Sequence, residues 1–293
     1  MILQIENLSK YYGKQRGVEH VGLALQEGEI FGLIGPNGAG KSTTIRSVMN
    51  MLNKTEGTVT FLGKQLDKNS IDLKRQIGYL PGEVFLYEDM KVSQMLDYHQ
   101  SFYKEDLSEK RKYLVEALQV DESKKIEDLS LGNRKKVGIV LALMHSPKLL
   151  ILDEPTSGLD PIMQKQFQNL LLEEKQRGTT IIYSTHILSE VSQICDRVGI
   201  VRDGRLIKVD EVENLSRHTL QHVTIVSVDA GKIAEKMKLH EYDLSEDTLK
   251  FKYDGDINAL LKVISCYPIT HLNIEEPSIE EIFMHYYQQE EEQ

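Results

Sequence analysis

The sequence has little of the features that mark several other protein classes. Two cysteines, Cys195 and Cys266, are too few for a disulfide framework in 293 residues and indicate a reducing compartment. The most apolar stretch, residues 138–144, is far shorter than the roughly 20 residues of a membrane-spanning helix. Basic residues number 35 against 45 acidic ones, and a net charge of −10 does not suit broad nucleic-acid binding. We therefore expect no nucleic-acid partner, and a function at a membrane would require a separate protein that spans it.

At about 150 residues per domain, the length predicts two domains. In residues 1–215, short apolar runs alternate with amphipathic stretches of helical period, which is typical of an α/β domain. A polar stretch with helical period, 92–120, interrupts the strands, so we predict a helical insertion over about 83–135. We expect strands at 30–34, 58–61, 77–80, 149–152 and 180–183, and helices around 45–52, 137–144 and 163–171.

A second, smaller α+β domain is expected over residues 216–293, after a linker at 212–220 where the composition shifts. Its predicted order is β-α-β-β-α-β, which suggests a ferredoxin-like fold. A closing helix is expected to begin at Ser278, whose spacing to Glu281 fits a capping box. The expected strands are 222–228, 241–244, 248–253 and 270–274, and the expected helices are 233–239 and 257–265.

A glycine-rich loop follows the first expected strand and opens a helix, in the pattern GxxxxGK(S/T). Glycines permit positive φ and turn several N–H groups toward one anion, and the helix N-terminus adds a favourable dipole. Lysine supplies a charge for the β- and γ-phosphates, and serine a hydroxyl for Mg²⁺. The loop consists of Gly35, Pro36, Asn37, Gly38, Ala39, Gly40, Lys41 and Ser42.

Two acidic residues, Asp153 and Glu154, directly follow the apolar run 149–152. Such a run is typical of a central parallel strand that is buried on both faces. Ligands bind at the C-terminal ends of these strands. Asp153 is therefore a candidate to hold Mg²⁺, and Glu154 a candidate base that orients or deprotonates an attacking water.

Together with three further segments, these motifs resemble the ATP-binding cassette (ABC) family, the ATPase subunits of ABC transporters. Residues 129–133, LSLGN, look like the family's LSGGQ signature, residues 157–160 match its D-loop, and 184–186 contain its switch histidine. Order and spacing agree over residues 1–215. The resemblance implies a P-loop NTPase fold of the ABC type with ATP and Mg²⁺ as cofactors.

The resemblance also implies a role for each matching residue. Tyr12 would stack on adenine, and the phosphate loop with Thr43 would bind the triphosphate. Ser130 and Gly132 would face the γ-phosphate of ATP held by a second subunit, and Asp160 would link the two sites.

The catalytic residues implied in this way are Lys41, Glu154 and His186, and His186 would contact the γ-phosphate. The metal ligands would be Ser42 and Asp153.

The partners implied by the resemblance are a second ATPase subunit and a transmembrane permease. One phosphate loop and one signature lie on different faces of the domain in this family, so two subunits, in a homodimer or a heterodimer, would complete each other's sites. The ending of the chain resembles subunits of bacterial exporters for antibiotics, peptides or lipid-linked material. Its start lacks the pattern of a signal peptide. We expect a cytoplasmic protein held peripherally on the inner face of the cell membrane through its permease.

Two positions depart from the family pattern. Gly82 stands where the family usually has glutamine, and Glu83 could replace it as a ligand of the metal site or simply face solvent. Leu131 stands in the signature where the family has glycine. The alternatives are a soluble ABC-type ATPase that transports nothing and a nucleotide-dependent regulatory subunit. The single cassette and the net charge argue against the first, and the intact acid pair and histidine against the second.

Overall fold

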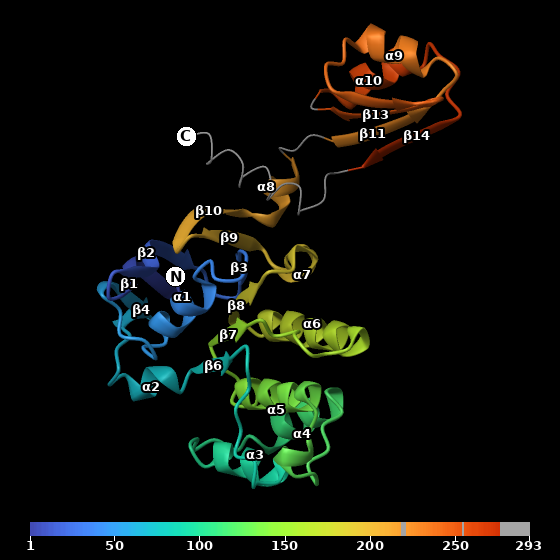
Figure 1. Ribbon diagram of the computed structural model, residues 1–293. Coiled ribbons are helices and arrows are strands. Elements are labelled where there is room, and N and C mark those ends of the chain that lie inside the picture. The colour runs from blue at the N-terminus through green and yellow to red at the C-terminus, as the bar shows by residue number, and fades with distance from the viewer. Residues whose placement is uncertain (218–220, 254, 276–293) are drawn as a thin grey trace. The chain divides into compact units, whose positions relative to one another are not determined.

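The computed structural model describes residues 1–217, 221–253 and 255–275 and divides the chain into two compact units, Met1–Glu211 and Val212–Gln293 (Figure 1). None of the described helices combines the length and the apolarity that a membrane crossing needs.

The first unit is built around a mostly parallel sheet. In sheet order its strands are β10 (Arg205–Glu211), β9 (Arg197–Arg202), β3 (Ile30–Ile34), β8 (Thr180–Thr185), β7 (Leu149–Asp153) and β6 (Ile77–Leu80). Only β10 pairs antiparallel to its neighbour. β3, β7 and β8 are buried along their whole length, as expected for apolar strands covered on both faces. The predicted strands of this sheet are confirmed, while β9 and β10 were not predicted.

An antiparallel sheet packs beside the main one. Its strands, in sheet order, are β2 (Gln15–Leu25), β1 (Leu3–Tyr12), β4 (Glu56–Phe61) and β5 (Lys64–Gln65). The expected strand 58–61 is therefore present as β4, but it belongs to this second sheet. Leucine, isoleucine and valine side chains of both sheets form one core with helix α1 (Lys41–Val48). Ala39 of the phosphate loop belongs to this core, which therefore holds the loop in place.

Helices α3 (Val92–Gln100) and α4 (Ser108–Ala117) form the predicted helical insertion and lie with α5 (Leu131–Leu143) beyond β6 (Figure 1). The helix α2 (Ile71–Lys74) precedes β6, and a short 3₁₀ turn, Ile126–Asp128, precedes α5. The helices α6 (Pro161–Gln176) and α7 (Leu188–Ile194) follow β7 and β8. The phosphate loop, the acid pair and the segment with His186 thus each begin at the end of a buried parallel strand.

The second unit has the predicted β-α-β-β-α-β order. Its strands β11 (Gln221–Val226), β12 (Tyr242–Ser245), β13 (Thr248–Tyr253) and β14 (His271–Glu275) pair antiparallel in the sheet order β12-β13-β11-β14. The helices α9 (Ala230–Met237) and α10 (Ile257–Ile264) pack on this sheet around a separate core. The expected linker begins with a helix, α8 (Val212–Arg217). The closing helix expected from Ser278 lies outside the described residues.

Candidate functional site

The phosphate loop joins β3 to α1, as the motif predicts. Gly38 and Gly40 have φ angles of 82° and 110°, in the region that favours glycine. A Cβ atom on Gly40 would lie 2.8 Å from a methyl group of Val18, so the loop also needs glycine for packing. Residues 36–38 form an exposed tip with the helix N-terminus behind it. This is the arrangement that binds phosphate through backbone N–H groups.

Lys41 turns back into the loop from the first position of α1. Its ammonium donates to the carbonyl oxygens of Gly35 at 2.7 Å and Pro36 at 3.3 Å, and it lies 3.5 Å from Oε1 of Glu154. The residue is only 5% exposed. A cation that is held by main-chain carbonyls can exchange them for phosphate oxygens when a ligand enters the loop.

Tyr12 lies at the end of β1, close to the phosphate loop. A Cβ atom on Gly17 would be 2.8 Å from Cε2 of Tyr12 and 3.2 Å from Cγ2 of Thr43. The tyrosine ring and Thr43 at the start of α1 therefore flank the same short stretch of β2. The ring is half exposed, and the ammonium of Lys10 lies 5.1 Å from its centroid. An exposed ring at this place can stack on a flat ligand.

The acid pair stands at the C-terminal end of β7. Asp153 is 2% exposed, and its Oδ1 accepts a hydrogen bond of 3.2 Å from the hydroxyl of Ser184. Glu154 has a φ of 46°, which a residue with a side chain seldom adopts. Its N–H still donates to the carbonyl of Ser184 at 3.0 Å. The backbone therefore changes direction at Glu154 itself and turns its carboxylate away from that of Asp153.

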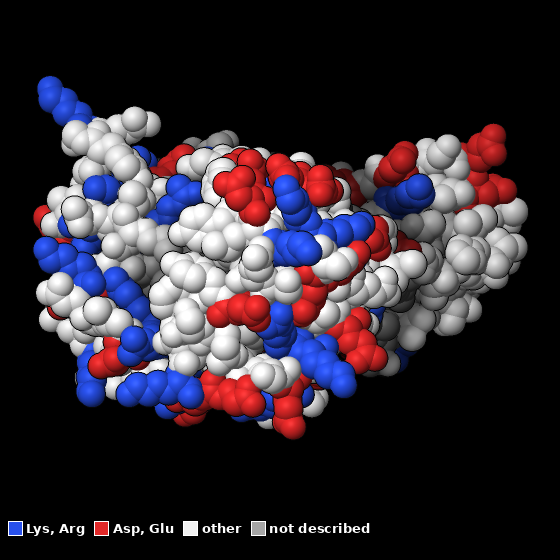
Figure 2. Space-filling model, turned by 90° about the horizontal axis from the view of Figure 1, so that it is seen from below, with Lys and Arg blue, Asp and Glu red and all other residues white. Residues whose placement is uncertain are grey.

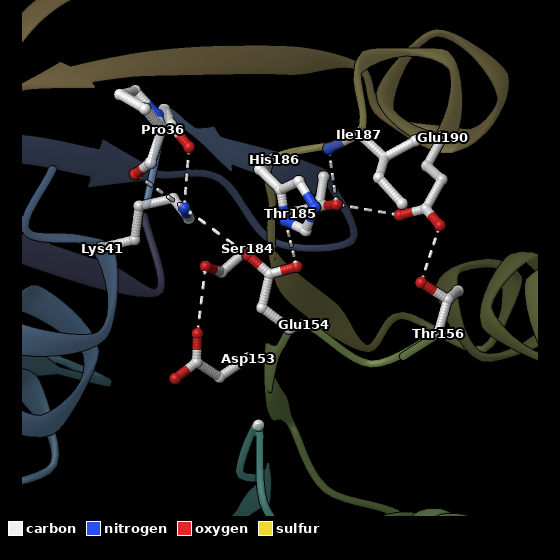
Figure 3. Close-up of polar contacts among 12 residues, drawn as sticks. Pro36, Lys41, Asp153, Glu154, Thr156, Ser184, Thr185, His186, Ile187 and Glu190 are labelled. Carbon is white, nitrogen blue, oxygen red and sulfur yellow. Dashed lines mark hydrogen bonds and ion pairs between the residues drawn. The ribbon is translucent and has the colours of Figure 1, made fainter. Parts of the chain in front are cut away.

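The Glu154 carboxylate joins the phosphate loop to the loop after β8 (Figure 3). Oε1 faces Lys41, and Oε2 lies 2.8 Å from Nδ1 of His186. The three predicted catalytic residues, which come from three separate loops, are thus brought together. A carboxylate held between a cation and an imidazole has the geometry of a general base whose orientation is fixed from two sides.

A buried glutamate that the sequence analysis did not identify supports this arrangement. Glu190 of α7 accepts hydrogen bonds from Thr156 at 2.6 Å and Thr185 at 2.9 Å (Figure 3). The hydroxyl of Tyr183 also donates to Glu190, at 3.0 Å. Thr156 follows Glu154 closely, and Thr185 precedes His186. Glu190 thereby ties the two loops that carry the predicted base and the predicted histidine. The sequence holds no specific signal for Glu190, because its position on a helix is equally typical of a solvent-facing glutamate.

The signature residues and the 157–160 segment meet each other in this structure. A Cβ atom on Gly132 would lie 2.5 Å from the carbonyl oxygen of Gly158, so only glycine fits there. Ser130 caps α5 by accepting from the N–H of Asn133, and Asp160 caps α6. Among the described residues, no hydrogen bond or ion pair connects these caps to the phosphate loop. Leu131 points outward and is 82% exposed.

The oxygen atoms of Ser42 and Asp153 are of the hard type that Mg²⁺ prefers. Ser42 lies in the first turn of α1 and Asp153 at the end of β7, and these two elements are in contact, so the residues fit the ion. The additional candidate, Glu83, is exposed, and no hydrogen bond or ion pair joins it to Asp153 in the described part of the chain. The neighbouring Gly82 has room for a side chain, because a Cβ atom there would meet only the Asp153 carbonyl at 3.7 Å.

The sheet order, the phosphate loop and the acid pair at the end of β7 define a P-loop nucleotide hydrolase. Sequence comparison narrows this class: the family model described as "ABC transporter" matches residues 18–157, and the one described as "ATP-binding protein DrrA1-3-like, C-terminal domain" matches residues 208–287. The chain belongs to the ABC transporter family as an ATP-binding subunit and is an ABC-type ATPase.

Individual relatives cover nearly the whole chain. The linearmycin resistance ATP-binding protein LnrL of Bacillus subtilis (strain 168) is 32% identical, over 97% of each chain. The bacitracin transport ATP-binding protein BcrA of Bacillus licheniformis is 31% identical, over 97% of this chain and 96% of its own. A solved ATP-binding subunit of an ABC transporter matches 74% of this chain and 92% of its own, with a TM-score of 0.70 and 30% identity.

Proposed function

We propose that this chain hydrolyses ATP, with Glu154 as the base, to energise an exporter whose membrane-spanning part is a separate permease. The observation that carries the proposal is the position of the Glu154 carboxylate between Lys41 and His186. In this assignment Lys41 releases its loop carbonyls to bind the β- and γ-phosphates, and Glu154 orients the attacking water. His186 keeps Glu154 in place from the side opposite Lys41.

The remaining site residues divide between nucleotide, metal and partner. Tyr12 stacks on adenine, and the backbone N–H groups of 35–43 hold the triphosphate. Mg²⁺, held by Ser42 and Asp153, would offset the charge of the phosphates. Ser130 and Gly132 would bind the nucleotide of a second subunit, because they lie at the N-terminal end of α5 and make no described contact with this phosphate loop. Asp160 would face the second subunit beside them.

Export is supported by the relatives and by a surface of the helical insertion. Two relatives are named for linearmycin resistance and bacitracin transport, which favours an exporter of antibiotic-like material. Four aromatic rings are exposed near α3, the most exposed being Phe85 at 85%, and Tyr98 contacts both Tyr87 and Phe102 edge to face. Figure 2 views the molecule from the side of these helices and shows uncharged surface between basic and acidic groups.

A hollow beside these aromatic rings supports this surface as the docking site for the permease. Its volume is about 360 Å³, and the residues that line it include Phe102, Tyr103 and Arg75. Exposed aromatic surface bordered by charge is typical of protein interaction sites. A peripheral position on the inner face of the cell membrane follows from such docking, since the chain itself is held there only through its partner.

The test is Glu154→Gln in the full chain. The variant keeps the size of the side chain and one acceptor oxygen but cannot accept a proton, so turnover should fall by about 10²–10⁴-fold while ATP binding is retained. Binding is measured with a fluorescent ATP analogue and turnover by phosphate release. Turnover at the wild-type rate would refute the assignment of Glu154 as the base. A strictly monomeric Glu154→Gln chain with MgATP would refute the shared sites.

A further inference from the structure

A buried lysine on the signature helix contacts the segment after β6. Lys135 lies on the second turn of α5 and is 3% exposed. Its ammonium donates to the carbonyl oxygen of Pro81 at 3.2 Å and to that of Gly82 at 2.9 Å. Burial of an ammonium is costly unless its N–H groups are bonded, and two main-chain carbonyls accept from it here.

The contact is the polar end of a tightly packed seam between α5 and β6. A Cβ atom on Gly138, one turn after Lys135, would be 2.9 Å from Leu80 and 3.0 Å from Val84. A Cβ atom on Gly78 would be 2.1 Å from a carbonyl oxygen of α5. Because the seam leaves no space for sliding, a displacement of α5 also displaces the segment 80–84.

Lys135 also acts on the acid pair through its charge. Burial lowers the pKa of Lys135 to about 8, while the carboxylates of Asp153 and Glu154 oppose that effect. Lys135 on α5 therefore interacts with both carboxylates through its charge, whereas Lys41 at the phosphate loop lies 3.5 Å from Glu154. The two cations thus act on Glu154 from different parts of the domain.

We propose that Lys135 is a positioning residue for ATP hydrolysis: it fastens segment 81–82 to the signature helix and places a positive charge near the acid pair Asp153–Glu154. The inference rests on the proposed function, in which Glu154 is the base. Movement of the signature helix against a second subunit's nucleotide is passed to the acid pair through this lysine. Nucleotide affinity does not depend on it, because Lys135 touches neither Tyr12 nor the phosphate loop.

The test is Lys135→Met in the full chain, with kcat and KM for ATP measured by phosphate release. Methionine has a similar length but carries neither a charge nor a donor. We expect kcat to fall about tenfold to a hundredfold, the scale of a small misplacement of reacting groups, with KM unchanged. Amide hydrogen exchange in residues 82–85 should accelerate, because the segment loses its attachment to α5. A merely structural lysine would change thermal stability without this split between kcat and KM.

Two further variants separate the charge of Lys135 from its hydrogen bonds and from a general effect of changing a lysine on α5. Lys135→Gln retains donors for the two carbonyls without the charge, should fold even where Met does not, and should recover part of the lost kcat. Lys136→Met is the matched control, since Lys136 is half-buried on the same helix and, among the described residues, does not bond segment 81–82. Wild-type kcat in both Lys135 variants would overturn the inference while leaving the base assignment intact. A wild-type chain that hydrolyses no ATP would overturn the proposed function and this inference together.

Discussion

Acid should destabilise the first unit through two histidines whose rings meet between α3 of the helical insertion and the end of α5. His99 of α3 and His145, just after α5, have ring centroids 5.6 Å apart, and Tyr103 stacks on His145 at 4.8 Å. Burial lowers the pKa of each histidine to about 4. Nε2 of His99 has no hydrogen-bond partner among the described residues. Both rings are therefore neutral in the folded chain down to a pH at which they are charged in an unfolded one.

The sign and size of the effect follow from proton linkage. The unfolded chain binds protons at a pKa near 6.5, so stability is full above that pH and falls as the pH drops toward 4. At pH 5, the pKa values of about 4 for the folded chain correspond to a loss of about 2 kcal/mol per ring. The pair together would lose about 4 kcal/mol, a large share of the roughly 5–15 kcal/mol that stabilises a typical domain.

The assay is urea unfolding at pH 7.5 and at pH 5 for the wild type and for the double variant His99→Phe with His145→Phe. Phenylalanine keeps the apolar contacts of the rings but cannot take a proton. The loss of unfolding free energy between pH 7.5 and pH 5 should therefore be about 4 kcal/mol smaller in the double variant than in the wild type. His20→Gln, at an exposed histidine, is the control and should leave the dependence unchanged. Equal pH dependence in wild type and double variant would refute the reasoning.

Two further substitutions test contacts of the candidate site. Gly132→Ala should force the signature away from the Gly158 carbonyl, at a cost of about 1–3 kcal/mol in stability, and lower ATP turnover. Gly82→Ala is the control and should be tolerated, because its Cβ atom would be 3.7 Å from the nearest atom. Equal melting temperatures and equal turnover in the two variants would contradict the contact. Glu190→Leu leaves three buried hydroxyl groups without their acceptor, so calorimetry should show a loss of about 1–3 kcal/mol per group, with a lower kcat; an unchanged melting temperature would argue against that network.

The central strands could be predicted because their apolar runs carry the signal in the sequence itself. The antiparallel strand β1 could not, because register shifts interrupt its alternation between Ile5 and Leu8 and again before Lys10. The hairpin of β9 and β10, by contrast, could have been predicted from the Asp-Gly pair between its strands. Asp203 and Gly204 both have positive φ, as expected of the Asp-Gly turn that favours two-residue hairpins.

At the candidate site, the residues that share a continuous motif could be predicted from the sequence. Those that meet only after folding could not. The phosphate loop and the acid pair each occupy one continuous stretch, so their positions at strand ends followed from the parallel sheet. Glu190 and Lys135 lie on helices whose spacing gives them no distinguishing pattern. Their importance comes from contacts with residues that are 34 and 53 positions away, which only packing determines.

The two buried lysines near the acid pair should respond differently when nucleotide binds. When a triphosphate enters the loop, Lys41 must share its charge with phosphate oxygens, which weakens its attraction for Glu154. Lys135 is bonded to carbonyls outside the loop, so its contribution to Asp153 and Glu154 remains. Loss of Lys41 should therefore act mainly on nucleotide affinity and loss of Lys135 on turnover. Glu154 is then influenced by the substrate through Lys41 and by the signature helix through Lys135.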